Sequence, residues 1–114
     1  MKRLVPALLS LAATAAPLPA GAAPPPDGPA LFGRTCAPCH AAGAPGALTL
    51  GRRLGPQSAI LEQRTDLTAA YIRLVVRRGL RVMPWVTAIE LRDRDLDAVA
   101  TYLTRNNAAA AARP

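Results

Sequence analysis

Residues that carry chemistry are scarce in this sequence of 114 residues, which has two cysteines, one histidine and two methionines. A single histidine leaves no Ser-His-Asp set and little means of general acid–base catalysis. Aromatic residues are few, namely one Phe, two Tyr and one Trp, so the chain has little large apolar material for a core of its own. No segment has a convincing strand pattern, and no internal repeat is present. These shortages argue against an independent catalyst and favour a helical domain.

The two cysteines and the histidine lie in one run, Cys36-Ala37-Pro38-Cys39-His40. C-x-x-C-H is the pattern of covalent haem attachment. Two thiols three positions apart on one turn can each add to a vinyl group on the same haem edge, and the next residue then brings an imidazole to the iron. We therefore predict one covalent heme c, with its iron, bound through Cys36, Cys39 and His40.

Three other interpretations compete for the same run. A thioredoxin-like redox pair is expected near a βαβ pattern, and none is present. A structural zinc site usually takes four Cys or His ligands, whereas this chain offers three. A disulfide between Cys36 and Cys39 closes a ring too small to stabilise the protein much. The histidine in the fifth place is not required by these alternatives and favours the haem.

Met83 is the candidate for the second axial ligand of the iron. Methionine often takes this role opposite a histidine, and the only other methionine, Met1, falls in a segment that we expect to be removed. Pro84 biases Met83 away from helical backbone. Met83 is therefore predicted to lie on a loop, from which its thioether can reach the face of the iron opposite His40. The alternative is that Met83 fills the core.

Taken together, these motifs resemble a small class I cytochrome c over residues 28–105. Gly28 and Phe32 precede the C-x-x-C-H run at the family's four-residue steps, and Met83-Pro84 resembles its axial-ligand loop. The positions that resemble its C-terminal helix are Leu96, Val99, Tyr102 and Leu103. The resemblance implies an all-α class I cytochrome c fold, with three to four helices packed around one haem.

Two contacts are implied by the same resemblance. Gly28 allows the C-terminal helix to cross closely, with the aromatic ring of Phe32 beside it. The carbonyl of Pro45 stands where the family's proline accepts a hydrogen bond from the proximal imidazole, here that of His40. Such a bond would fix the imidazole tautomer and tune the iron.

Residues 1–22 have the pattern of a secretory signal peptide, with Lys2 and Arg3 before an apolar run and an A-x-A site ending at Ala22. The run is too short to span a bilayer, although an uncleaved anchor is an alternative. We predict a periplasmic protein with no membrane span in the mature chain. The predicted parts are a Pro-rich lead at 23–27, a cytochrome c domain at 28–106 and a disordered tail at 107–114.

Local signals predict three main helices. The first runs from Gly28 to Arg34 or Thr35 after an Asp27 cap, the second from Thr68 to Arg78 with Gly79 as its terminator, and the third from Asp93 to Arg105. A short helix is expected from Gln57 to about Gln63. The segment 41–56 is rich in Gly, Ala and Pro and is expected to be a loop. The resemblance to cytochrome c implies that this loop wraps the haem on the His40 side.

The second helix has an apolar stripe and a basic face. The stripe is made by Leu67, Tyr71, Leu74 and Val75 and is widened by Ile72. On the opposite face Arg73 and Arg77, with Arg81 beyond the helix, either form a solvated surface or rim the exposed haem edge and dock an acidic partner. Arg78 and the indole of Trp85 are candidates to contact a haem propionate.

The net charge is +7, and it becomes +5 once Lys2 and Arg3 are removed, with twelve Arg against seven acidic residues. This charge favours acidic partners, and no nucleic-acid-binding motif accompanies it. An iron held by His and Met has no open position, so the predicted function is electron transport rather than catalysis.

The run from Tyr71 to Gly79, followed by Met83-Pro84-Trp85, resembles the cytochrome subunits of flavin-dependent phenol dehydrogenases. That resemblance implies a flavoprotein dehydrogenase as the electron donor. Two alternatives are a free soluble carrier to an oxidase, and a five-coordinate haem protein that binds small ligands or acts as a peroxidase.

Overall fold

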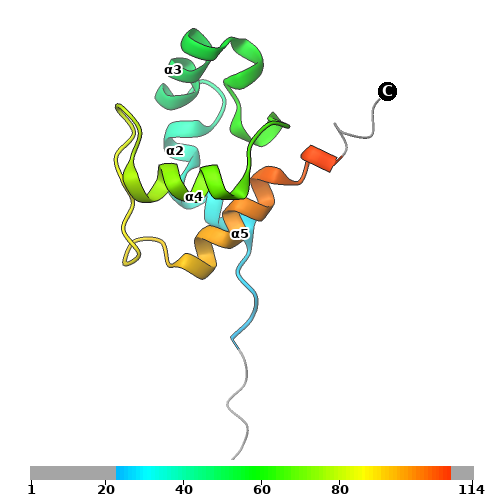
Figure 1. Ribbon diagram of the computed structural model, residues 1–114, viewed down its shortest axis with the longest axis vertical. Helices are drawn as coiled ribbons and strands as arrows, with labels where there is room; N and C mark the ends of the chain where they lie inside the picture. The colour runs from blue at the N-terminus through cyan, green and yellow to red at the C-terminus, as the bar shows by residue number, and fades with distance from the viewer. Residues whose placement is uncertain (1–22, 109–114) are drawn as a thin grey trace, which may run out of the picture.

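The computed structural model describes residues 23–108 (Figure 1). Within that range the chain is helical, and the only β-type pairing is an isolated bridge between Leu80 and Met83. The predicted signal peptide and residues 109–114 of the predicted tail lie outside the described residues. The all-α fold class is confirmed for the part of the chain that the structure describes.

The helices follow one another in the order α1 (Gly28–Thr35), α2 (Ala37–His40), α3 (Pro45–Leu54), the 3₁₀ turns η1 (Pro56–Ser58) and η2 (Leu61–Gln63), α4 (Ala69–Arg78) and α5 (Asp93–Thr104). Among the described residues no helix is both long enough and apolar enough to cross a bilayer.

The caps of α1 and α4 are those that the sequence predicts. The Asp27 side chain accepts from the N–H of Ala30 at 3.2 Å, and Pro29 stands in the first turn of α1. The Thr68 hydroxyl accepts from the N–H of Tyr71 at 3.1 Å, and α4 stops at Gly79, which has φ of 72°. Each cap satisfies a main-chain group that the end of a helix leaves unpaired.

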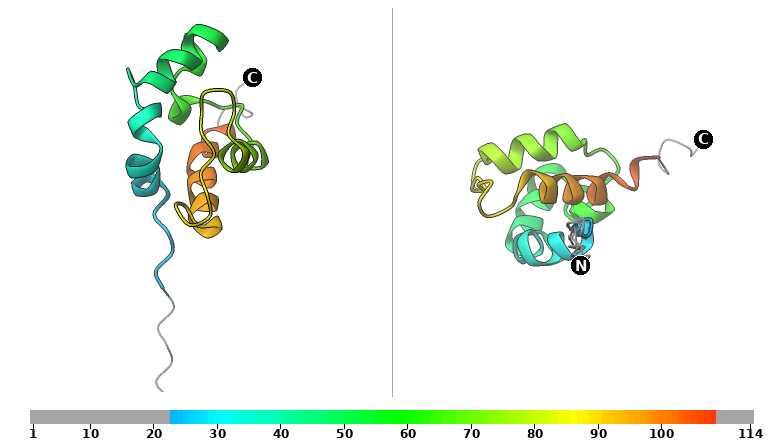
Figure 2. Two further views of the ribbon diagram at one scale, coloured as in Figure 1. Left: turned by 90° about the vertical axis from the view of Figure 1, so that its left-hand side faces the viewer. Right: turned by 90° about the horizontal axis from the view of Figure 1, so that it is seen from below.

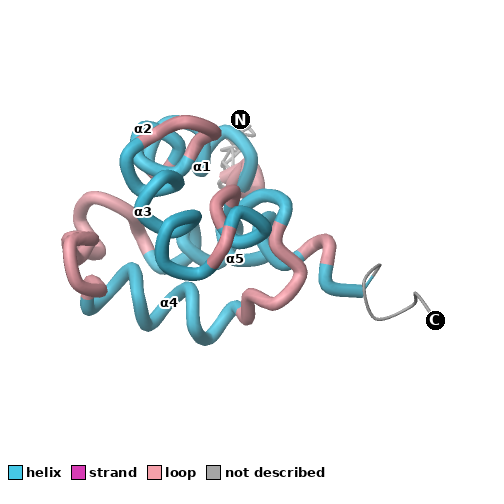
Figure 3. Tube along the Cα trace, turned by 90° about the horizontal axis from the view of Figure 1, so that it is seen from above, coloured by secondary structure: helices cyan, strands magenta, loops and turns pink. Residues whose placement is uncertain are grey.

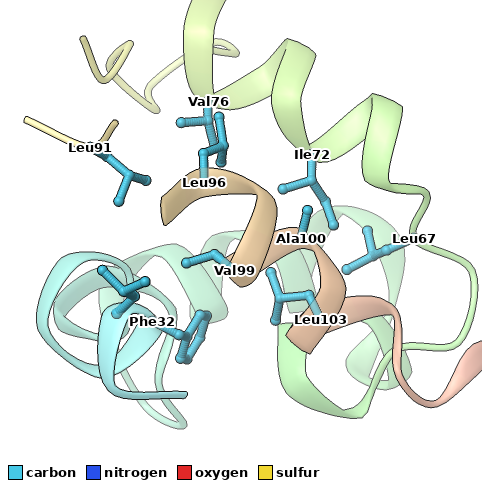
Figure 4. Packing of buried hydrophobic residues seen from close by; sticks show 10 residues of the cluster. Phe32, Leu67, Ile72, Val76, Leu91, Leu96, Val99, Ala100 and Leu103 are labelled. Atoms are coloured by element: carbon cyan, nitrogen blue, oxygen red, sulfur yellow. The ribbon is translucent and has the colours of Figure 1, made fainter. Parts of the chain in front are cut away.

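The core is built around α5. Its buried side chains Leu96, Val99, Ala100 and Leu103 contact α1 on one side and α4 on the other (Figure 4). Seen from above, α1 and α2 lie on one side of α5, and α4 lies on the other (Figure 3). The cluster also includes Leu31, Phe32, Leu67, Ile72, Val76 and Leu91.

The crossing of α1 and α5 confirms the role expected for Gly28. A Cβ at that position would stand 2.5 Å from the carbonyl oxygen of Ala98 and 3.0 Å from Cβ of Tyr102. The rings of Phe32 and Tyr102 lie next to the crossing, with centroids 5.8 Å apart. The two helices touch through backbone, which only a residue without a side chain permits.

The prediction of a loop over residues 41–56 is wrong, because Pro45–Leu54 forms the ten-residue helix α3. Pro45 occupies the first turn, where its fixed φ suits a helix and its missing N–H costs nothing. Gly46 and Gly51 weaken a helix in isolation. Here they let α3 pack closely, since Gly46 lies against Cys39 and Gly51 against Ala59.

The short helix predicted from Gln57 to about Gln63 is also wrong. The structure has two separate 3₁₀ turns, η1 and η2, which are interrupted at Ile60 by extended backbone with φ of −101° and ψ of 108°. The 3₁₀ turn η2 packs against α5. Tyr102 of α5 donates its hydroxyl to a carboxylate oxygen of Glu62, so contacts with α5 position this segment.

The apolar stripe of α4 differs in phase from the prediction. The side chains buried by the protein core are Leu67, Ile72 and Val76, whereas Tyr71 and Leu74 are about half exposed. Because the main packing partner of α4 is α5, the Tyr71 and Leu74 side of the helix is left about half exposed.

Candidate functional site

The run Cys36 to His40 forms a single helical turn directly after α1. Cys36 closes α1 by donating its N–H to Phe32 O at 2.8 Å, and its own carbonyl accepts from the N–H groups of Cys39 at 3.1 Å and His40 at 2.9 Å. No disulfide joins Cys36 to Cys39 in the described part of the chain. The turn therefore presents two thiols and an imidazole from one rigid unit attached to the core through α1.

Burial, with the neighbouring Cys39 thiol as a smaller cause, raises the pKa of Cys36 to about 11. A thioredoxin-type nucleophile requires the opposite shift, toward a stable thiolate. The electrostatics of the turn thus argue against the thiol–disulfide interpretation. The zinc interpretation finds no support either, because residues 23–108 contain no group of three His, Cys, Asp or Glu side chains that could hold a metal ion.

The imidazole of His40 is partly buried, and this burial lowers its pKa below the ordinary value. A neutral imidazole is the form that binds iron. Its Nδ1 atom is buried and has no hydrogen-bond partner in the described part of the chain. The bond expected from His40 to the carbonyl of Pro45 is therefore absent from the described structure. That carbonyl accepts from the hydroxyl of Thr49 at 2.8 Å, which leaves it a second lone pair.

Gly46 is a site residue that sequence reasoning missed. A Cβ on Gly46 would stand 2.6 Å from the carbonyl oxygen of Cys39 and 3.3 Å from Cε1 of His40. The missing side chain lets the first turn of α3 lie directly on α2. A signal was present in the sequence, since glycine after a helix-starting proline is costly unless something packs there.

Met83 lies on a tight hairpin, as Pro84 predicts. The main chains of Leu80 and Met83 exchange two hydrogen bonds of 3.0 Å, and Arg81 at the tip has φ of 57°. Gly79 makes room for the returning strand, because a Cβ there would stand 2.8 Å from the carbonyl oxygen of Met83. The hairpin holds Met83 at a set position outside the helices.

The C-x-x-C-H turn and the hairpin meet at the same core. Cys36, Ala37 and Met83 are all partly buried against the cluster formed by α1, α4 and α5. In Figure 1 both α2 and the loop from α4 to α5 lie to the left of α5, and the left view of Figure 2 shows α2 beside α1 and the loop beside α4. Segments more than forty positions apart in the sequence thus pack against one core cluster.

Large apolar side chains near these segments lack protein cover. Each of these residues is about half exposed or more. They are Leu48 and Leu54 of α3, Tyr71 and Leu74 of α4, and Leu80, Val82 and Trp85 of the hairpin loop. A core so short of aromatic residues, with bare apolar side chains on three elements, suits a large apolar prosthetic group. Together with the imidazole of His40 and the thiols of Cys36 and Cys39 on one turn, these features fit heme c.

Arg73 stays on the exposed surface of α4, as one of the two interpretations expects, whereas the side chain of Arg77 is only 25% exposed. Arg73 donates to Asp97 at 2.6 Å and Arg77 to Asp93 at 2.7 Å, so both face α5 and neither is a free charge on an interaction surface. Among the described residues, those without an ion pair include Arg34, Arg52, Arg53, Arg78 and Arg81. Among residues 23–108, the side chains of Arg78 and Trp85 make no hydrogen bond to the protein. Their contacts with a haem propionate stay predictions.

A fold of helices around an α1–α5 crossing, with a C-x-x-C-H turn and a methionine hairpin beside its core, is that of a class I c-type cytochrome. Residues 23–103 match the family model described as "Cytochrome C oxidase, cbb3-type, subunit III", and the chain belongs to this cytochrome c family. No curated protein and no solved structure matched the chain. The family carries covalently bound heme c with iron, transfers electrons and works with a redox partner.

Proposed function

We propose that this protein is a periplasmic monohaem electron carrier in which Cys36 and Cys39 bind the haem covalently and His40 and Met83 are the axial ligands. The observation that carries the proposal is the approach of Cys36 and Met83 to one core cluster. When bound, heme c supplies an iron that alternates between the ferric and ferrous states by one electron. The polypeptide has to hold that group rigidly and exclude other reactions.

The residues divide this task. The α2 turn carries both thiols and His40 within five residues, and burial lowers the pKa of His40, which favours the neutral imidazole. The Leu80–Met83 hairpin presents a thioether from a separate element. If His40 and Met83 both bind the iron, no coordination site would remain for a substrate, and we therefore propose an electron carrier and not a five-coordinate peroxidase.

The periplasmic location is supported by the signal-peptide pattern of residues 1–22. Cytochrome c domains typically work outside the cytoplasm, and export would precede thioether formation. Cleavage after Ala22 would leave the lead at 23–27, the domain at 28–106 and the tail at 107–114 as the mature protein.

The electron donor that we propose is a flavoprotein dehydrogenase with an acidic docking surface. Support comes from the resemblance of residues 71–85 to cytochrome subunits of such enzymes, and from Arg78 and Arg81, which have no carboxylate partner among residues 23–108. One electron passes to each chain, so oxidation of a two-electron donor takes two successive transfers. The family name favours an oxidase as the alternative partner.

The decisive experiment is intact mass and a reduced-minus-oxidised spectrum of protein exported by a host with haem-maturation machinery. We expect the mass of the chain from Ala23 plus one haem, and a sharp reduced α-band. The double variant Cys36→Ala/Cys39→Ala is the matched control and should lose covalent haem. Bare wild-type polypeptide with a Cys36–Cys39 disulfide would contradict the proposal.

The donor is tested by stopped-flow reduction of the ferric protein with a reduced FAD-dependent phenol dehydrogenase, and separately with a haem–copper oxidase as electron acceptor. We expect fast reduction that slows as salt is raised, because exposed charges are screened. The double variant Arg78→Gln/Arg81→Gln should slow it, whereas Arg34→Gln should not. Fast oxidation by the oxidase without reduction by the flavoprotein would favour the alternative.

A further inference from the structure

The guanidinium group of Arg77 lies where α4, the methionine loop and α5 come together. It donates to the carbonyl of Val86 at 2.9 Å and to that of Leu91 at 2.7 Å. It also donates twice to one carboxylate oxygen of Asp93, at 2.7 and 3.2 Å. One side chain therefore connects the last turn of α4 with the end of the loop and the first residue of α5.

Val86, three residues after Met83, is held from both sides by consecutive residues of α4. Its N–H donates to the carbonyl of Val76 at 2.7 Å, and its own carbonyl accepts from Arg77. Before Met83 in the chain, Leu80 forms the first anchor through its two main-chain hydrogen bonds with Met83. Val86 is the second anchor, and among the described residues Arg77 is the only side chain that hydrogen-bonds to it.

From this geometry we infer that Arg77 is a positioning residue that keeps the thioether of Met83 on the iron. The inference rests on the proposed function, in which Met83 is the axial ligand. Loss of the Arg77 bonds frees the loop between Met83 and Leu91 and raises the fraction of molecules in which the methionine has left the iron. Arg77 acts through the loop and touches no reacting atom.

The ion pair with Asp93 is not what makes Arg77 effective. The side chain of Asp93 is 83% exposed, whereas that of Arg77 is 25% exposed, and an exposed ion pair contributes little. The bonds to two main-chain carbonyls are partly buried and charge-assisted, which makes them stronger. Only the planar fork of arginine has donors spaced to reach Val86, Leu91 and Asp93 together, and a lysine ammonium does not.

Arg73 offers a matched control on the same helix. It lies one turn before Arg77 and pairs with Asp97 of α5 at 2.6 Å, but it makes no hydrogen bond to the methionine loop. Arg73→Gln removes the same charge and the same kind of α4–α5 ion pair. A comparison of Arg77→Gln with Arg73→Gln in the haem-loaded protein isolates the contacts to the loop.

The measurement is the affinity of the ferric protein for imidazole, which binds the iron only after the methionine has left. The apparent affinity rises with the fraction of molecules in which the site is open. We expect Arg77→Gln to bind imidazole about tenfold more tightly than wild type, from the loss of charge-assisted bonds. Arg73→Gln should match wild type, Arg77→Lys should be intermediate, and the methionine–iron charge-transfer band should weaken only in the Arg77 variants.

The outcomes separate the two proposals. A wild-type protein without the methionine–iron band overturns the ligand assignment and this inference together. A wild-type protein with the band, and equal imidazole affinities for Arg77→Gln and Arg73→Gln, overturns the inference alone. If Arg77→Gln does not accumulate, Arg77→Lys decides: tighter imidazole binding than wild type supports the inference, and wild-type affinity refutes it.

Discussion

The carbonyl oxygen of Ala98 lies 2.5 Å from the point where a Cβ on Gly28 would stand. At this point α1 and α5, the two helices that carry most of the core, pack backbone against backbone. The C-x-x-C-H turn continues directly from α1. The distance between backbones at this crossing therefore determines where both thiols and His40 stand relative to the core.

Gly28→Ala should reduce the free energy of unfolding by about 1 to 3 kcal/mol, because an added methyl group forces α1 and α5 apart. Chemical denaturation of the haem-loaded protein measures the change. Gly33→Ala is the matched control on the same helix, since nothing lies within 4 Å of its Cβ position. It should instead stabilise the protein by about 0.5 to 1 kcal/mol. Equal effects of the two substitutions would contradict the proposed role of the crossing.

Gly46→Ala should disturb the proximal side of the haem. The new methyl group would collide with the carbonyl oxygen of Cys39 and press on Cε1 of His40, so the imidazole must rotate or shift. We expect a changed reduction potential and an altered ferric spectrum at unchanged haem content. Gly51→Ala on the same helix meets only a side-chain methyl, that of Ala59, at 3.2 Å. A potential that moves equally in both variants would exclude a specific effect on His40.

Met83→Ala should remove the methionine–iron charge-transfer band, convert the ferric iron to high spin and lower the reduction potential, because methionine ligation raises it. Absorption spectroscopy and potentiometry measure these changes. Val82→Ala changes the neighbouring residue, which is 84% exposed, and should leave both properties as in wild type. A low-spin spectrum with an unchanged potential in Met83→Ala would show that another group binds the iron.

The carboxylate of Asp95 should stabilise the folded protein at neutral pH and lose this effect in acid. The hydrogen bond from Arg92, at 2.9 Å, holds the pKa of this buried carboxyl below its ordinary value. A carboxyl with a lowered pKa in the folded state stabilises that state fully above the unfolded pKa of about 3.9, and the contribution disappears as the pH falls through the folded value. Asp95→Asn should therefore be less stable than wild type at pH 7, and the difference should shrink below about pH 4.

Unfolding of wild type and Asp95→Asn as a function of pH tests this expectation. Arg92→Gln should reproduce most of the effect, since Arg92 supplies the hydrogen bond. A stability difference that stays constant from pH 7 down to pH 3 would show that Asp95 acts through packing and not through its charge.

Signals carried by neighbouring residues were sufficient to predict the parts of this molecule that are locally determined. Asp27, Thr68 and Gly79 cap or end helices at the predicted positions, because a cap is a hydrogen bond between residues three or four positions apart. The C-x-x-C-H run forms one turn for the same reason. The non-helical position of Met83 follows from the steric effect of Pro84 on the residue before it.

Only the tertiary structure decided the features that depend on distant partners. α3 forms over a glycine- and proline-containing stretch because it packs on α2 and η1, and the Pro45-Gly46 pattern does not identify these partners. Arg73 and Arg77 face Asp97 and Asp93, residues 24 and 16 positions away, so their roles could not be read from helical spacing.

The roles of Gly46 and Arg77 became visible only when backbone approaches and carbonyl partners were in place. The sequence by itself determined the class of protein, its cofactor and its main helices, because these depend on residue types at short spacings. Packing determined which surfaces are free and which side chains hold the candidate ligands, because burial and long-range hydrogen bonds exist only in the folded chain.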